Sequence, residues 1–152
     1  AGLFLAEFVP EGRRLLVIPK PATMRPLGEV WRLGSLLLAT TGELWAAGRA
    51  TRAAERGRPG YQSESREERR DVAAAALRGG YPEGTPVNFE ASRLPLDEVA
   101  VRELSVEEPI GWADGEVRVR WRAGAPLAGA PALESYLRER AALLISPPLA
   151  SS

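Results

Sequence analysis

Apolar residues in this chain fall mainly in short runs separated by glycine and proline, a pattern typical of strands joined by turns. The run at 13–18 stops at Pro19 and predicts a strand. Further strands are expected at 29–33 and 87–91, while residues 99–106 fit either a strand or a helix. Two other segments carry a turn dipeptide between β-prone runs and therefore predict hairpins.

The first predicted hairpin turns at Thr41-Gly42. Pairing the strands about that dipeptide places Leu37 and Leu44 on one face, with Leu38 and Trp45 on the other. Because both faces are apolar, we expect the hairpin to be covered on both sides.

The second predicted hairpin turns at Asp114-Gly115. Alternation along its strands separates an apolar face from a charged one, which predicts an antiparallel pair covered on one side. The apolar face consists of Ile110, Trp112, Val117, Val119 and Trp121, and the charged face of Glu116, Arg118, Arg120 and Arg122.

Two segments have the periodicity of amphipathic helices. In the first, Ser65 and Glu68 have the spacing of a capping box and Gly79-Gly80 predicts the stop. The second helix is expected to start near Pro131, with Leu137 buried against the sheet. The predicted apolar stripes are Val72, Ala73, Ala76 and Leu77 in the first helix, and Leu133, Tyr136, Leu137, Ala141 and Leu144 in the second.

This order of elements predicts an α+β fold. The expected architecture is a mostly antiparallel sheet, as a bent sheet or a partial barrel, with one inserted helix and a C-terminal amphipathic helix packed on it. At 152 residues the chain has the size of one domain, which we expect to span residues 1–145, followed by a flexible tail at 146–152.

Composition removes several kinds of chemistry. The chain has no Cys and no His. It therefore lacks thiol nucleophiles, disulfides, Cys/His zinc ligands and imidazole catalysis. We expect no catalytic residues, no metal and no cofactor, and we interpret the acidic pairs Asp97-Glu98 and Glu107-Glu108 as ordinary surface.

Charge and hydropathy limit the partners and the cellular location that we expect for this protein. Lys plus Arg and Asp plus Glu are 20 each, so the formal net charge is zero, which counts against a nucleic-acid partner. Arginine-rich, alanine-rich usage with a single lysine, Lys20, indicates a GC-rich bacterial genome. No apolar run reaches the ~20 residues of a membrane span, and the first residues do not resemble a secretory signal. A cysteine-free chain fits a reducing compartment, so a cytoplasmic location is expected.

Two groups of arginines are candidate ligand sites. Arg56, Arg58, Tyr61 and Ser63 precede the first predicted helix, where free amides and the helix dipole favour a small anion. The alternative is an ordinary capped loop whose negative charge comes from the helix's own glutamates.

The second group is Arg118, Arg120 and Arg122, which alternate along one strand at a spacing of about 6.8 Å. They suit phosphate or carboxylate ligands, and the alternative is a solvated face paired with Glu116 and Glu107.

Together these features favour a non-catalytic binding or interaction protein, with a protein partner or a homo-oligomer left open. The alternative is a small enzyme that uses Arg, Tyr and carboxylate chemistry on an anionic small molecule. A third hypothesis, binding of nucleic acid or anionic lipid through the same arginines, has the net charge against it. Where the arginines lie, and whether acids neutralise them, separates the three.

Overall fold

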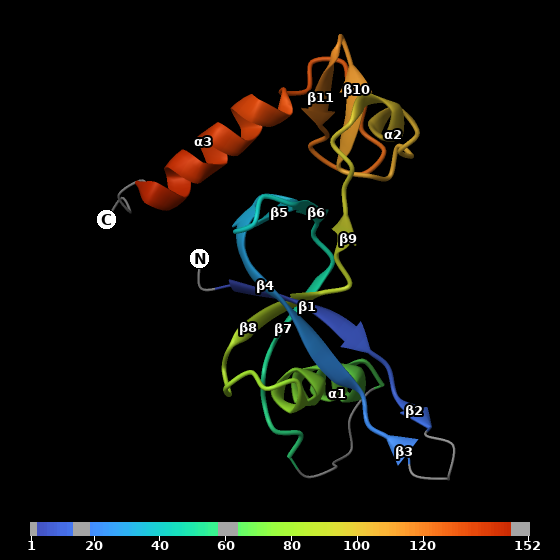
Figure 1. Cartoon of the computed structure of the whole chain (residues 1–152), viewed down its shortest axis with the longest axis vertical. Coiled ribbons are helices and arrows are strands. Elements are labelled where there is room, and N and C mark those ends of the chain that lie inside the picture. Colours follow the sequence, from blue (N-terminus) through green and yellow to red (C-terminus); the bar gives the residue numbers. More distant parts are fainter. Residues whose placement is uncertain (1–2, 14–18, 58–63, 147–152) are drawn as a thin grey trace. The chain divides into compact units, whose positions relative to one another are not determined.

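The computed structural model describes residues 3–13, 19–57 and 64–146. It confirms the predicted α+β class: a seven-stranded sheet in the order β7-β8-β1-β4-β5-β6-β9, two small two-stranded sheets and three helices (Figure 1). The sheet is mostly antiparallel, with β1 and β8 as a parallel pair. It stays open, so the partial barrel that the sequence allowed does not form.

The elements have the following bounds. The main sheet contains β1 (Leu3–Val9), β4 (Thr23–Leu33), β5 (Leu36–Ala39), β6 (Leu44–Ala46), β7 (Arg49–Arg52), β8 (Pro86–Phe89) and β9 (Ser92–Arg93). The small sheets pair β2 (Gly12–Arg13) with β3 (Pro19–Lys20), and β10 (Ile110–Ala113) with β11 (Glu116–Val119). The helices are α1 (Glu64–Arg78), α2 (Glu98–Arg102) and α3 (Leu133–Ile145). Of the strand predicted at 13–18, residues 14–18 lie outside the described residues.

The chain forms two compact units, each with its own core. Unit 1 consists of residues 1–31, 39–42 and 47–92, and unit 2 of residues 32–38, 43–46 and 93–152. The single domain expected for 1–145 stays a prediction. Of the predicted tail, residues 147–152 lie outside the described residues.

Unit 1 packs α1 on one face of its strands. Val72, Ala75 and Ala76 of α1 share a core with Val87 and Phe89 of β8. Alanines let the helix approach the sheet closely, and each large apolar side chain buried there stabilises the unit by about 1.5–3 kcal/mol. The predicted stripe was partly wrong, because the helix buries Ala74 and Ala75 and leaves Ala73 half-buried.

The predicted start of α1 is wrong, and its predicted end is confirmed. The helix already includes Ser65, so the capping box predicted there is wrong by its position. The stop at Gly79-Gly80 is confirmed: Gly80 has φ of 102° and donates from its amide to the Leu77 carbonyl. A side chain at Gly79 would strike the Met24 carbonyl, so this glycine lets the last turn of α1 rest on β4.

Unit 2 has a core of leucine and β-branched side chains: Leu36, Leu44, Leu94, Val101, Ile110 and Val119. The first turns of α3 pack on this core through Leu133, Tyr136 and Leu137, and the Tyr136 hydroxyl donates to the Leu33 carbonyl at 3.2 Å. Leu137 is only half-buried, and Leu144 is 54% exposed. The expectation of a stripe buried along the whole helix is therefore wrong for its second half.

The position of the turn determines the strand register in both hairpins. Asp114 and Gly115 have φ of 53° and 78°, and Trp112 pairs with Val117 as predicted. In the other hairpin Leu38 pairs with Leu44 and Leu37 with Trp45, so the predicted register is wrong by one residue. The connection is longer than two residues, because Gly42 closes a turn by donating to the Ala39 carbonyl at 2.9 Å.

The chain after β11 departs from the predicted alternation. The strand ends at Val119, and Trp121, expected on the apolar face, is 74% exposed. The ambiguous segment after Asp97 is helical at its start. There α2 begins with the Asp97 carboxylate accepting from the Ala100 amide at 3.0 Å.

Candidate functional site

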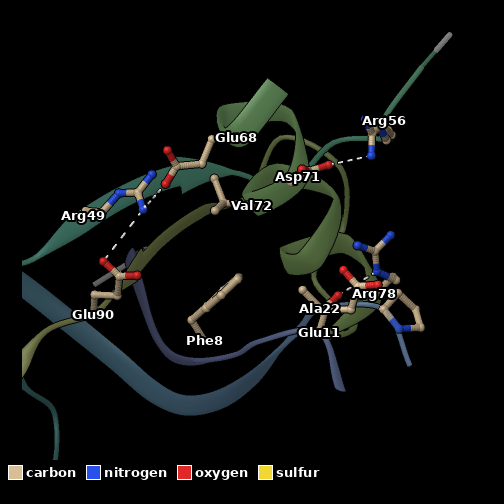
Figure 2. Close-up of a pocket in the computed structure, with 11 residues that line it drawn as sticks. Phe8, Glu11, Ala22, Arg49, Arg56, Glu68, Asp71, Val72, Arg78 and Glu90 are labelled. Carbon is tan, nitrogen blue, oxygen red and sulfur yellow. Dashed lines mark hydrogen bonds and ion pairs between the residues drawn. The ribbon is translucent and has the colours of Figure 1, made fainter. Parts of the chain in front are cut away.

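A pocket of about 450 Å³ lies in unit 1 beside α1 (Figure 2). Its lining combines an apolar centre with side chains of both charges, three of them arginines and four carboxylates. The lining residues are Phe8, Glu11, Pro21, Ala22, Arg49, Arg56, Glu68, Asp71, Val72, Arg78 and Glu90.

Helix α1 supplies one wall because of its periodicity. Asp71 and Val72 follow Glu68 by three and four residues, which places both on the same side of the helix as Glu68. Arg78 follows Asp71 by two turns and lies on the same side. Phe8 of β1 and Val72 form the apolar middle of the pocket (Figure 2).

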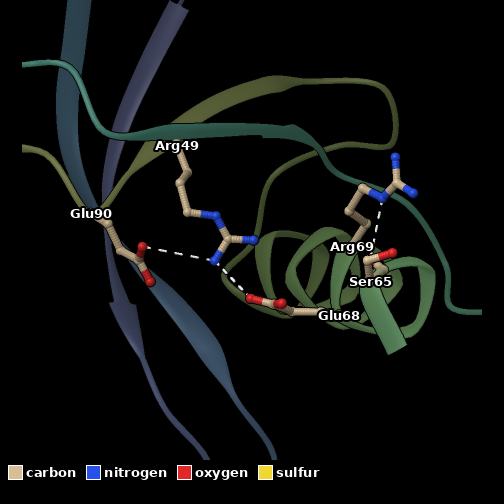
Figure 3. Close-up of polar contacts among 5 residues, drawn as sticks. All are labelled: Arg49, Ser65, Glu68, Arg69 and Glu90. Carbon is tan, nitrogen blue, oxygen red and sulfur yellow. Dashed lines mark hydrogen bonds and ion pairs between the residues drawn. The ribbon is translucent and has the colours of Figure 1, made fainter. Parts of the chain in front are cut away.

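Arg49 of β7 closes one end of the pocket. Its guanidinium lies 2.9 Å from the Glu68 carboxylate and 3.8 Å from the Glu90 carboxylate, between the helix and the end of β8 (Figure 3). It also stacks on the buried Phe89 ring, with 5.0 Å to the ring centroid. These contacts hold Arg49 in place and leave its charge neutralised.

Glu90 takes an uncommon backbone conformation at this end. Its φ is 54°, in the left-handed region that costs a non-glycine residue about 1 kcal/mol. Gly48 accommodates the turn, because any side chain there would overlap the Glu90 carbonyl. The backbone thus holds the Glu90 carboxylate at the rim of the pocket.

Arg56 lies on a second side and is bound by two acids of α1. Its guanidinium is 2.6 Å from the Glu67 carboxylate and 2.7 Å from the Asp71 carboxylate. Arg56 comes from the loop that the sequence analysis selected. The other members of that group, Arg58, Tyr61 and Ser63, lie outside the described residues.

Arg78 and Glu11 complete the charged lining of the pocket (Figure 2). Arg78 donates from Nε to the Ala22 carbonyl at 2.8 Å, which leaves its two Nη groups with no carboxylate partner among the described residues. Glu11 likewise has no ion pair within the described part of the chain. The pocket lining therefore offers one charge of each sign, Arg78 and Glu11, that has no ion-pair partner among the described residues.

The arginines 118, 120 and 122 do not form one exposed face in unit 2. Arg118 donates to the Ala130 carbonyl and pairs with Glu116. Arg120 is buried, and Arg122 stacks on the exposed Trp121 ring at 4.7 Å. The solvated face expected as the alternative does not form, because the strand and its regular alternation end at Val119.

Buried Arg120 instead connects the start of β10 to the segment that follows β11. Its Nε donates to the Ala125 carbonyl, and Nη1 to the carbonyls of Glu108 and Ile110, each at 2.9 Å. Gly111 makes room for the guanidinium, since a side chain there would lie 3.0 Å from Nη2. The role of Arg120 in the described structure is to fix the backbone.

Most pocket residues were missed by the sequence analysis. Phe8 and Glu11 lie at or just after the end of β1, Arg49 lies in β7 and Glu90 follows β8, and no local motif connects these three segments. Arg78 precedes Gly79-Gly80, where a basic residue is typical of any helix end. Its position two turns after Asp71 places it on the same side of the helix, but this spacing alone is a weak indication of a shared site.

Three further findings bear on function. Among the described residues, no three carboxylates gather closely enough to ligate a metal ion. None of the helices in the described ranges has the length and apolar character needed to cross a membrane. Comparison of the chain with models of protein families, with curated proteins and with solved structures gives no match.

Proposed function

We propose that this protein is a non-catalytic binding domain whose pocket in unit 1 holds a small polar ligand. The observation that carries the proposal is the pocket itself, with charged groups converging around Phe8 and Val72. Its volume of about 450 Å³ lies within the range of sites for small molecules. An apolar centre supplies affinity, and a few placed charges supply orientation.

Two features favour binding over catalysis. The described lining contains no hydroxyl side chain that could act as a nucleophile. Glu68 and Asp71 already have arginine partners, at 2.9 and 2.7 Å. The lining groups that have no ion-pair partner among the described residues are one guanidinium and one carboxylate, which can hold a ligand by ion pairs.

The test is an NMR titration of the full chain with a panel of small carboxylates, amines, amino acids, phosphates and sugars. We expect at least one class to shift the amides of Phe8, Ala22 and Val72, while Val119 of unit 2 serves as an internal control. Mass spectrometry of the bound compound after prolonged incubation should show it unchanged. Shifts confined to unit 2 would contradict the proposed site, and conversion of the compound would contradict the non-catalytic assignment.

A further inference from the structure

Pairing among the charged residues of the pocket restricts the kind of ligand that fits. Arg49 and Arg56 are both neutralised by carboxylates, at 2.9 Å or less for their shortest contacts. A simple anion would therefore find only Arg78 unpaired while lying among several carboxylates. A simple cation would find Glu11 and leave the Arg78 guanidinium unsatisfied.

We propose that the pocket binds a zwitterionic α-amino acid with an apolar side chain, a ligand class that rests on the proposed binding function. The amino acid's carboxylate contacts Arg78 and its ammonium group contacts Glu11. Its side chain lies over Phe8 and Val72. An α-amino acid carries its ammonium and carboxylate groups on one carbon, so a single small ligand presents both charges to Arg78 and Glu11 and leaves its side chain for the apolar centre.

Arg78 is suited to a carboxylate because its orientation is already fixed. Its Nε donates to the Ala22 carbonyl at 2.8 Å, so the Nη pair is held without help from the ligand. A guanidinium fork binds the two oxygens of a carboxylate in parallel. The close approach of Gly79 to Met24 fixes the helix turn that carries Arg78.

The part of the pocket beside Arg49 favours an apolar side chain over a charged one. The Arg49 guanidinium is occupied by Glu68 and Glu90 and by the face of Phe89. A ligand carboxylate there would have to displace Glu68, and a ligand ammonium would lie beside Arg49. Burying a side chain on Phe8 and Val72 contributes about 25 cal/mol per Å² of apolar surface.

The experiment compares three compounds with one carbon skeleton. L-Leucine has both charges, 4-methylpentanoate lacks the amino group, and 3-methylbutylamine lacks the carboxylate. In calorimetric or NMR titrations of the full chain, we expect L-leucine to bind about tenfold or more tightly than either analogue. Equal binding of L-leucine and one analogue would overturn the inference.

Substitutions of Arg78 and Glu11 test the proposed contacts with the ligand's carboxylate and ammonium groups. Arg78→Gln and Glu11→Gln should each weaken L-leucine binding about tenfold, and Arg66→Gln, an exposed arginine of α1 outside the pocket, should change it less than about twofold. Because Arg78 also contacts Ala22, Arg78→Gln could unfold the helix end. Glu11→Gln removes no described contact. Its effect on L-leucine binding therefore tests the assignment even if Arg78→Gln disturbs the fold. Unchanged binding in Glu11→Gln would overturn the assignment.

The panel of small carboxylates, amines, amino acids, phosphates and sugars distinguishes failure of the amino-acid inference from failure of the proposed binding function. If L-leucine fails to bind while phosphates, sugars or single-charge compounds shift the amides of Phe8 and Val72, the amino-acid inference is wrong and the binding function stands. If no class shifts the pocket amides, both fail.

Discussion

Arg120 stabilises the backbone of unit 2 through hydrogen bonds to the carbonyls of Glu108, Ile110 and Ala125. Arg118, Arg120 and Arg122 form a regular alternation in sequence, which predicted a common face. In the structure Arg120 is 7% exposed and donates to the carbonyls of three residues, whereas Arg122 is exposed. Those carbonyls lie 5 to 12 residues away in the chain, so periodicity alone could not identify them.

Arg120→Met should destabilise the protein by about 3 kcal/mol or more, because it removes the donor from two buried carbonyls and from the half-buried carbonyl of Glu108. Arg120→Lys should cost less, since an ammonium group keeps some of these bonds but lacks the fork. Urea denaturation measures the free energy of unfolding, with Arg122→Met as the exposed control. If Arg120→Met and Arg122→Met lower the free energy of unfolding by the same small amount, the hydrogen bonds of Arg120 do not contribute to stability.

Tyr81 makes stability depend on pH at the alkaline end. Burial raises the pKa of its phenol above the ordinary value of about 10. Above about pH 10 the unfolded chain loses this proton before the folded chain does. The free energy of unfolding therefore falls as pH rises from about 10 through the folded-state pKa, and the contribution is complete below about 10.

Tyr81→Phe should flatten that part of the pH dependence. Denaturation at about pH 9 and pH 11 measures the difference, and Tyr136→Phe, which leaves Tyr81 in place, should keep the fall. An unchanged slope in Tyr81→Phe would show that another group is responsible.

At the scale of elements, turn chemistry decided which predictions held. Asp114-Gly115 takes positive φ at both positions, which closes a two-residue turn, and the whole register followed from it. Thr41-Gly42 lacks a first residue suited to positive φ, and the chain instead closes a longer connection at Gly42. A register shift of one residue then moves every side chain to the other face.

The same limit applies to the candidate site. The predicted loop supplied Arg56, because a helix start is visible in sequence. Arg49, Arg78 and Glu11 reach the pocket only through the pairing of β7, β8 and β1 and the docking of α1. Those are long-range contacts, and local patterns do not encode them.

Helix α3 provides an element-scale prediction through a matched pair. Leu137 packs on the unit 2 core and Leu144 is 54% exposed. Leu137→Ala should cost about 1–2 kcal/mol, roughly half the value for a fully buried leucine, and Leu144→Ala less than about 0.5 kcal/mol. The midpoint of urea denaturation measures both. A larger loss in Leu144→Ala would mean that the second half of α3 is covered in solution.

The whole molecule interleaves its two units in sequence. The chain passes from one unit to the other after Trp31, Leu38, Gly42, Ala46 and Ser92. Neither unit is a continuous stretch of chain, so unfolding one of them releases the ends of segments that belong to the other. We therefore expect the single cooperative domain that chain length also predicts.

Amide hydrogen exchange tests this cooperativity. Val87→Ala removes a side chain that is fully buried in unit 1, which should cost about 2 kcal/mol, and Val99→Ala, at a side chain 71% exposed, should cost almost nothing. In a cooperative domain the slowest amides of both units exchange through global unfolding. Val87→Ala should then lower the protection of the Val119 amide in unit 2 by the same free energy as that of the Phe89 amide in unit 1. If only the unit 1 amides lose protection, the two units unfold independently. In that case, because the pocket lies in unit 1, ligand binding would stabilise that unit alone.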